Sequence, residues 1–230
     1  MVAGRPTQPK GGLMDLVTAE QFLLNQIPVR HRVLFAPVFK NAYDAAREIA
    51  KAEPVLQVPS AEDNHGRVIS WAVDLGFQRL IESGAWPVDY RWAYFAKPTG
   101  RYLQVKLSHS VLSISQVLDP AIQPRDAVFR QNARINNREP YFALPEFDDT
   151  MMVAGLPSFL LVHGYQEFAF AHIGVPHPVH QRDYIYQTPN LLNLPHEVPS
   201  DLPPVEETDT EEVMSLKAEI DKWRQDNGYE

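Results

Sequence analysis

The chain contains no cysteine among its 230 residues. This absence excludes a disulfide scaffold, a thiolate-ligated metal site and a cysteine nucleophile. The chain also lacks any run of 18 apolar residues, so the sequence predicts no membrane partner. Residues 1–13 lack the apolar segment of a secretory signal, and we therefore expect a cytoplasmic protein that begins with a flexible leader at residues 1–17.

Motifs that bind nucleotides or activate a serine are missing too. Neither Gly-x-Gly-x-x-Gly nor Gly-x-x-x-x-Gly-Lys-Ser/Thr occurs, which argues against a Rossmann cofactor and against P-loop hydrolysis. There is no Gly-x-Ser-x-Gly nucleophile elbow. In a strand, Ser108 and Ser110 would point away from His109, so this segment does not predict a serine hydrolase.

The acidic excess of the chain, 29 Asp and Glu against 21 Lys and Arg, is confined to one end. Residues 197–230 hold 11 acidic and three basic residues and account for the whole net charge of −8. Residues 1–196 hold 18 of each sign. A neutral body excludes a strongly basic nucleic-acid-binding domain, but the tail's acidity says nothing against a few phosphate contacts elsewhere.

Hydrophobic spacing divides the body into helices followed by strands. It predicts helices at residues 18–26, 37–52 and 60–83, with Thr18 and Gln21 forming a capping box and Gly84 ending the third helix. Alternating patterns then predict strands at 91–95, 102–107, 111–117, 159–163 and 168–173. The order predicts a single α+β domain over residues 18–194, in which N-terminal helices pack on an antiparallel β-sheet.

The acidic tail reads as a linker followed by a helix. Residues 195–207 form a Pro-rich acidic linker, and residues 208–226 form an amphipathic C-terminal helix. Val213, Leu216, Ile220 and Trp223 recur at a 3–4–3 spacing and make one narrow apolar seam. Such a seam is typical of a helix that docks in a groove, so it predicts binding to a protein partner, a second copy or the body itself.

Asp89 stands at the start of one predicted strand, and Gln104-Val105-Lys106 lies on the next. Because side chains alternate along a strand, Gln104 and Lys106 point to one face. A carboxylate beside a lysine can hold Mg²⁺ or Mn²⁺ and orient a water for attack on a phosphodiester. The order Asp…Gln-x-Lys resembles the PD-(D/E)xK nuclease superfamily, one branch of which has Gln in the middle position.

This resemblance covers about twenty residues. It implies a metal-dependent nuclease with Asp89, Gln104 and Lys106 as its catalytic residues. The sequence departs from the family where a helix should follow the lysine, because residues 107–117 have the pattern of a strand. The alternative interpretation is a plain amphipathic hairpin whose polar side faces water.

Arginines recur at a helical spacing soon afterwards. Arg130, Arg134 and Arg138 are four residues apart, and Arg125 precedes them. A helix over 125–138 would place the three on one face about 6 Å apart, a spacing similar to that of phosphates along a strand. Since Arg binds phosphate bidentately, the stripe predicts a phosphate clamp; the alternative is a solvated face, or pairing with carboxylates of the body or tail.

Half of the eight histidines fall within a short stretch. His163, His172, His177 and His180 are followed by Asp183, and imidazole with carboxylate suits Zn²⁺ or another transition metal. A histidine here could also act as a general base, or simply bond a backbone carbonyl.

Three functions follow. The first is a nucleic-acid-directed protein, in the sharpest form a phosphodiesterase. The second is a non-catalytic interaction or regulatory protein that acts through its C-terminal helix, and the third is a His-ligated metalloprotein.

Overall fold

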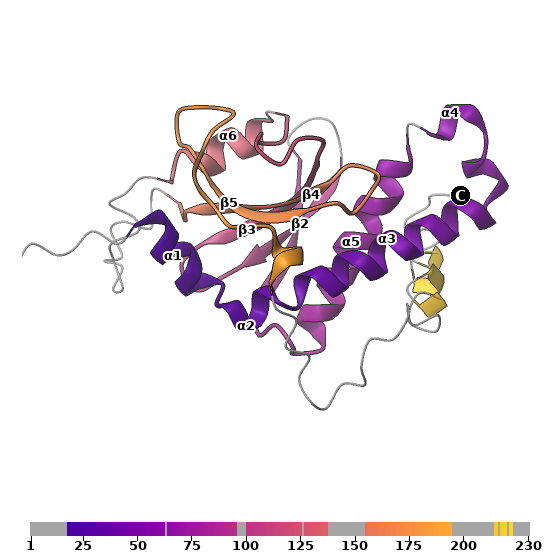
Figure 1. Ribbon diagram of the computed structural model, residues 1–230, viewed down its shortest axis with the longest axis horizontal. Coiled ribbons are helices and arrows are strands. Elements are labelled where there is room, and N and C mark those ends of the chain that lie inside the picture. Colours follow the sequence, from indigo (N-terminus) through magenta and orange to yellow (C-terminus); the bar gives the residue numbers. More distant parts are fainter. Residues whose placement is uncertain are drawn as a thin grey trace, which may run out of the picture.

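The computed structural model describes residues 18–62, 64–95, 100–125, 127–137 and 155–194, together with residues 214, 215, 217–219, 221 and 222. Within this part the protein is α+β, with its helices first and its strands after them, as the sequence predicts. Figure 1 shows the long helices beside a twisted sheet. The predicted leader at 1–17 and linker at 195–207 lie outside the described residues.

Local sequence signals account for where the helices begin and end. The helices are α1 (Ala19–Gln26), α2 (Val29–Arg32), α3 (Phe35–Ala52), α4 (Pro59–Glu62), α5 (His65–Glu82) and α6 (Val128–Arg134), with 3-10 turns η1 (Pro54–Leu56) and η3 (Leu191–Asn193). The capping box is confirmed, because the Gln21 amide donates to Thr18 Oγ1 at 3.2 Å and the Thr18 amide donates to Gln21 Oε1 at 3.0 Å. Gly84 has the expected left-handed backbone, with φ 78°.

The third predicted helix is divided in two. The short helix α4 takes its first residues, and α5 begins only at His65. The Asn64 amide donates to the Ala61 carbonyl at 2.8 Å, which closes a turn between the two helices. No helix of the described residues is long and apolar enough to cross a membrane.

The strands form one six-stranded sheet in the order of the sequence. They are β1 (Asp89–Tyr94), β2 (Arg101–Lys106), β3 (Val111–Val117), β4 (Ser158–Gly164), β5 (Ala171–Pro176) and β6 (Tyr184–Gln187). The sheet is mixed rather than wholly antiparallel, because β3 and β4 run parallel. A hairpin cannot join parallel strands, so the chain returns across one face of the sheet, and α6 lies within this crossover.

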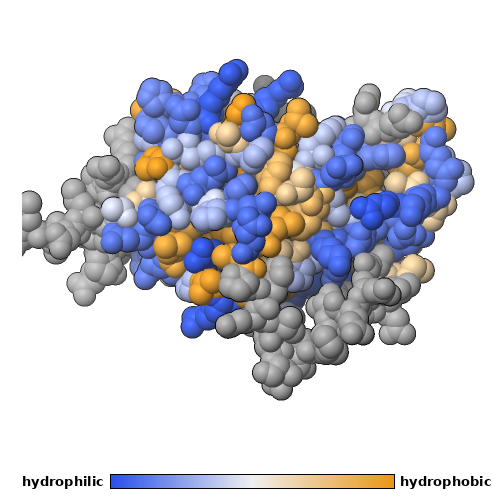
Figure 2. Space-filling model, viewed as in Figure 1, coloured by the Kyte–Doolittle hydropathy of each residue, from blue (hydrophilic) through white to orange (hydrophobic). Residues whose placement is uncertain are grey.

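The two faces of the sheet are covered differently. Helices α3 and α5 cover one face, and their Phe39 and Phe77 join the core formed by Leu112, Leu161 and other inward-facing strand residues. The short helix α6 lies against the other face, where Val117, Leu160 and Val162 form a smaller apolar cluster. The main core therefore lies between the sheet and the long helices. In the view of Figure 2, apolar residues gather in a band through the middle of a mostly polar surface.

Candidate functional site

The hairpin residues of the predicted nuclease site lie together on the sheet face opposite the long helices. Asp89 pairs with Lys106 in the antiparallel register, and both side chains are exposed. Gln104 lies on the same face but is buried, and its Oε1 accepts a hydrogen bond from Arg91 Nε at 2.7 Å. The oxygen that would ligate a metal is therefore already bonded. The strand β3, rather than a helix, follows Lys106, as the sequence pattern indicates.

The predicted arginine stripe is only partly assembled, and it faces inward. The helix α6 is shorter than the predicted segment, and Arg130 donates to Ser115 Oγ at 3.1 Å and to the Arg125 carbonyl at 2.7 Å. Arg134 is buried against the sheet side, with 7% of its surface exposed. Arg134 is therefore not open to a phosphate, whereas Arg130 is half-buried, and phosphate binding by the stripe stays a prediction. Only the Arg125 side chain is exposed, and Arg138 lies outside the described residues.

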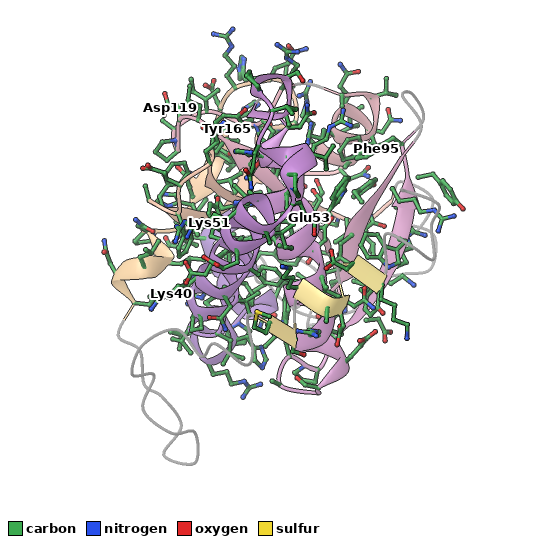
Figure 3. All side chains as sticks on the ribbon, turned by 90° about the vertical axis from the view of Figure 1, so that its right-hand side faces the viewer. Lys40, Lys51, Glu53, Phe95, Asp119 and Tyr165 are labelled. Atoms are coloured by element: carbon green, nitrogen blue, oxygen red, sulfur yellow. The ribbon has the colours of Figure 1, made fainter. Side chains whose placement is uncertain are left out.

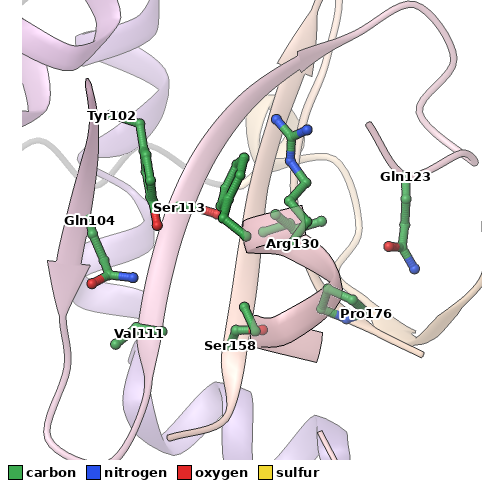
Figure 4. Close-up of a pocket in the computed structure, with 11 residues that line it drawn as sticks. Tyr102, Gln104, Val111, Ser113, Gln123, Arg130, Ser158 and Pro176 are labelled. Carbon is green, nitrogen blue, oxygen red and sulfur yellow. The ribbon is translucent and has the colours of Figure 1, made fainter. Parts of the chain in front are cut away.

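Beneath α6 lies a small cavity of about 20 Å³, lined by both polar and apolar side chains, which has room for one water. Figure 4 shows Gln104 and Ser113 on neighbouring strands, with Arg130 and Ser158 beside them. The arginine and the hairpin glutamine thus share a closed space rather than an open groove. This geometry suits an internal water better than a nucleic-acid strand.

Asn137, just after α6, anchors the crossover to the sheet. Its Nδ2 donates to the carbonyls of Ser158 and Pro176, both at 2.9 Å, and its Oδ1 accepts from the Ser158 amide at 2.7 Å. The side chain is fully buried. All of its hydrogen-bonding groups are used, so we assign it a structural role.

The four histidines of the predicted metal site are not brought together. His163 is buried beneath the long helices, whereas His172 lies on the opposite face and bonds the Thr188 carbonyl through Nδ1 at 2.8 Å. His177 and His180 stack in the loop after β5, with ring centroids 4.4 Å apart. Nδ1 of His177 already accepts two backbone N–H groups. Asp183 lies before β6 with an exposed side chain, and within the described residues no three His, Asp or Glu side chains group to hold a metal.

The C-terminal helix contacts the body of the same chain. Arg79 on α5 donates from Nε to Glu219 Oε2 at 2.8 Å, forms a second ion pair with that carboxylate, and donates to Ser215 Oγ at 3.3 Å. Lys217 lies near Glu48 of α3 and, after the larger effect of Lys51, helps to lower the pKa of that carboxyl. The predicted seam residues Val213, Leu216, Ile220 and Trp223 lie outside the residues whose side chains are described.

An open cleft lies where the parallel strands β3 and β4 end. Ligands of open sheets with parallel strands bind outside the carboxyl ends of those strands, and β3 and β4 end at Val117 and Gly164. Beside these ends, α3, η1, α5 and the turn after β4 enclose a cleft of about 550 Å³. We call it the carboxyl-end cleft. Figure 3 labels Lys51, at the end of α3, and Tyr165, in the turn after β4.

The carboxyl-end cleft has apolar walls and polar residues among its lining. Its lining residues are Tyr43, Ala46, Arg47, Ala50, Lys51, Leu56, Gln57, His65, Val68, Ile69 and Gln166. Two of the polar groups are fixed, because Gln57 Nε2 donates to the Lys51 carbonyl at 2.6 Å and His65 Nε2 bonds the Leu56 carbonyl at 3.1 Å. A pocket of this size with a few placed polar groups is typical of a small-molecule site.

A buried tyrosine–histidine pair lies at the inner end of the cleft. The Tyr43 hydroxyl donates to the Gly164 carbonyl, so its oxygen accepts the Nδ1–H of His163 at 2.7 Å. His163 is 1% exposed and stacks near Phe39. Burial lowers the pKa of His163 to about 3 and raises the pKa of the Tyr43 hydroxyl far above its usual range. Both groups are therefore neutral at physiological pH.

The turn that borders the cleft holds its central residue in an unusual conformation. Gln166 has φ 62°, and the Glu167 amide donates to the Tyr165 carbonyl at 2.8 Å across it. A non-glycine residue in the left-handed region costs of order 1 kcal/mol or more, and such residues cluster at binding sites. Gln166 is also one of the residues that line the cleft.

A further polar side chain lies beside this pair. Gln116, at the end of β3, has a buried Nε2, and its contact with the Tyr43 hydroxyl partly offsets the rise in the Tyr43 pKa that burial causes. Its register partner on β4 is His163. Helix α5 can approach this point because a Cβ at Gly66 would lie 3.1 Å from Gln116 Oε1.

The sequence indicates His163 but groups it with histidines that lie elsewhere in the structure. It gives no indication of Tyr43, Gln116 or Gln166. One feature of the sequence could have indicated the cleft. Ala46 and Ala50 are small residues four positions apart on α3, and small side chains on one helix face leave space beside it. Comparison with known proteins adds no relative, since no protein-family model, curated protein or solved structure matches the chain.

Proposed function

We propose that the chain binds a small, partly apolar molecule in the carboxyl-end cleft. The observation that carries this proposal is the position of the cleft, beside the ends of the parallel strands and against the Tyr43–His163 pair. Groups with strongly shifted pKa values are more frequent at functional sites than elsewhere. The strained Gln166, which lines the cleft, supports the same location.

The test is a titration of the full chain with N-phenyl-1-naphthylamine, a neutral probe whose fluorescence increases in apolar pockets. Ala50 lines the cleft, so Ala50→Trp should fill it and weaken probe binding at least about tenfold. Ala52→Trp is the matched control, because Ala52 is exposed on the same helix and does not line the cleft.

Thermal unfolding of both variants establishes that they fold. Loss of binding in Ala50→Trp alone supports the proposal. Equal affinity in both variants and the parent chain, or no binding by the parent, contradicts it.

A second candidate is the nucleic-acid-directed function, which one observation favours. Asp89 and Lys106 are register partners, and both are exposed, so a phosphodiester could reach them together. In this proposal Lys106 would orient the attacking water, and Mg²⁺ or Mn²⁺ bound at Asp89 would polarise the phosphate.

Plasmid and RNA cleavage with each metal would test it. We expect Lys106→Ala to lose activity, while Lys40→Ala, which removes an exposed lysine of α3, keeps it. No cleavage by the parent chain with either metal, or full activity in Lys106→Ala, rejects the nuclease.

A further inference from the structure

We infer that the ligand of the carboxyl-end cleft is an organic anion, a conclusion that rests on the proposed function and adds the ligand's chemical class. The cleft combines apolar walls with positive charge at one side. Arg47 and Lys51 line it, and within the described residues no Asp or Glu does. A ligand with an apolar body and a carboxylate, sulfonate or phosphate would satisfy both features.

The two cations follow one another along the cleft side of α3. Arg47 and Lys51 are four residues apart, so they lie one above the other on the same helix face. Their side chains are long enough to follow a charged group of the ligand. Together they place two positive charges on one wall, while Ala46 and Ala50 on the same helix offer apolar surface below them.

Arg47 and Lys51 each form an ion pair with an acidic residue of the same helix. Arg47 pairs with Asp44 and Lys51 with Glu48, each at 2.9 Å and three residues away on α3. The two cationic side chains are 61% and 65% exposed. The Lys51–Glu48 pair is exposed on both sides and contributes little, so a ligand anion can compete for Lys51 most readily, whereas the Asp44 partner of Arg47 is only 19% exposed.

The groups deeper in the cleft suit the uncharged part of the ligand. Tyr43 lines the cleft with a neutral hydroxyl that is bonded to the buried His163 behind it, and Leu56, Val68 and Ile69 add apolar surface. An anionic group buried there would lose its hydration without gaining a cation. The charge of the ligand therefore belongs at the outer side, beside Arg47 and Lys51.

The experiment compares two fluorescent probes that share a ring system. 8-Anilinonaphthalene-1-sulfonate carries a sulfonate, and N-phenyl-1-naphthylamine lacks it. We expect the full chain to bind the anionic probe more tightly at low salt, with the preference falling as salt rises. Arg47→Gln and Lys51→Gln should each weaken the anionic probe about 1.5- to 5-fold and leave the neutral probe unchanged.

The matched control is Lys40→Gln, which removes an exposed lysine of α3 that does not line the cleft. Equal affinity for the two probes, or an anion preference that survives in the Arg47→Gln, Lys51→Gln double variant, overturns the anion assignment. If the neutral probe still binds and Ala50→Trp still blocks it, the proposed function stands while this inference fails. If neither probe binds, the proposed function fails first.

Discussion

Each face of the sheet carries a buried polar cluster, and the two clusters differ in whether an open cleft lies beside them. Under α6, Asn137 uses all its bonding groups on backbone atoms of β4 and β5. Under the long helices, Tyr43 and His163 bond each other, and Tyr43 also lines the open carboxyl-end cleft. The Asn137 cluster fastens the crossover to the sheet, whereas the Tyr43–His163 pair lies beside space that a ligand could enter.

The largest change in stability is expected from a substitution of Asn137. Asn137→Ala leaves buried backbone groups of Ser158 and Pro176 unsatisfied, so we expect a loss of about 4 kcal/mol in unfolding free energy, measured by urea denaturation. The exposed Asn132→Ala on α6 should change it by less than about 0.5 kcal/mol. Probe binding by folded Asn137→Ala should stay at the parent value, and a selective loss there would contradict a purely structural role.

The pair on the other face predicts a dependence of stability on pH. The pKa of His163 is lowered to about 3 in the folded state, while the unfolded state has the ordinary value of 6.5. The unfolded state therefore binds more protons between these values, and acidification from pH 6.5 to 4.5 should cost about 2 kcal/mol through this group.

His163→Gln should remove most of that dependence, whereas the exposed His180→Gln should keep it. Asp74 acts in the opposite direction, because burial raises the pKa of its carboxyl to about 7, but it is present in every variant compared. Denaturation at the two pH values measures the difference. Equal acid sensitivity in the parent and in His163→Gln would show that His163 is not held neutral by burial.

Tyr43→Phe removes the hydroxyl that bonds His163 and Gly164 but keeps the aromatic ring that lines the cleft. It leaves the His163 Nδ1–H and the Gly164 carbonyl without the hydroxyl, so we expect a loss of about 2 kcal/mol. The ring remains, and the neutral probe should bind within about twofold of the parent. Tyr94→Phe is the matched control, because that ring is exposed; a similar loss in both would refute the special role of the buried pair.

Gln166→Gly should stabilise the chain, in contrast to the changes above. Glycine adopts φ 62° without the steric cost, although it gains freedom in the unfolded state, so the net gain is about 0.5 kcal/mol. Glu167→Gly, one residue further along the same turn, should not stabilise. Thermal unfolding compares the two, and a destabilised Gln166→Gly would mean that the turn is unstrained.

Arg79→Ala should have the smallest effect on global stability, at most a few tenths of a kcal/mol, because its pairing with Glu219 is partly exposed. Its effect should be local. A helix of the predicted tail length is marginal alone in water, so amide hydrogen exchange of residues 214–222 should accelerate. Arg67→Ala, exposed on the same helix, is the control. Unchanged exchange in Arg79→Ala would show that other contacts hold the tail.

The elements that follow from neighbouring residues were predictable. Thr18 and Gln21 satisfy each other within one helical turn, and Val111–Val117 alternates as a strand must. The parallel pairing of β3 with β4 was not predictable, because it joins segments whose local patterns fit either direction. The pairing decides where the strands end, and therefore where the cleft lies.

The candidate site was harder still to predict. Tyr43 and His163 are 120 residues apart, and neither lies in a sequence motif that predicts their contact. His163 drew attention only because other histidines follow it, yet the alternation of strand faces separates it from His172. Residues that are close together in the sequence can therefore lie on opposite faces of the sheet, where they cannot form one site.

The β3–β4 pairing also bears on how fast the chain folds. Its two strands are separated by residues 118–157, so the central contact of the sheet forms only after a long loop has closed. Pairings of this kind slow folding relative to the hairpins on either side. We therefore expect the β1–β2–β3 and β4–β5–β6 meanders to form first, and their joining along β3 and β4, fastened by Asn137, to be the slower step.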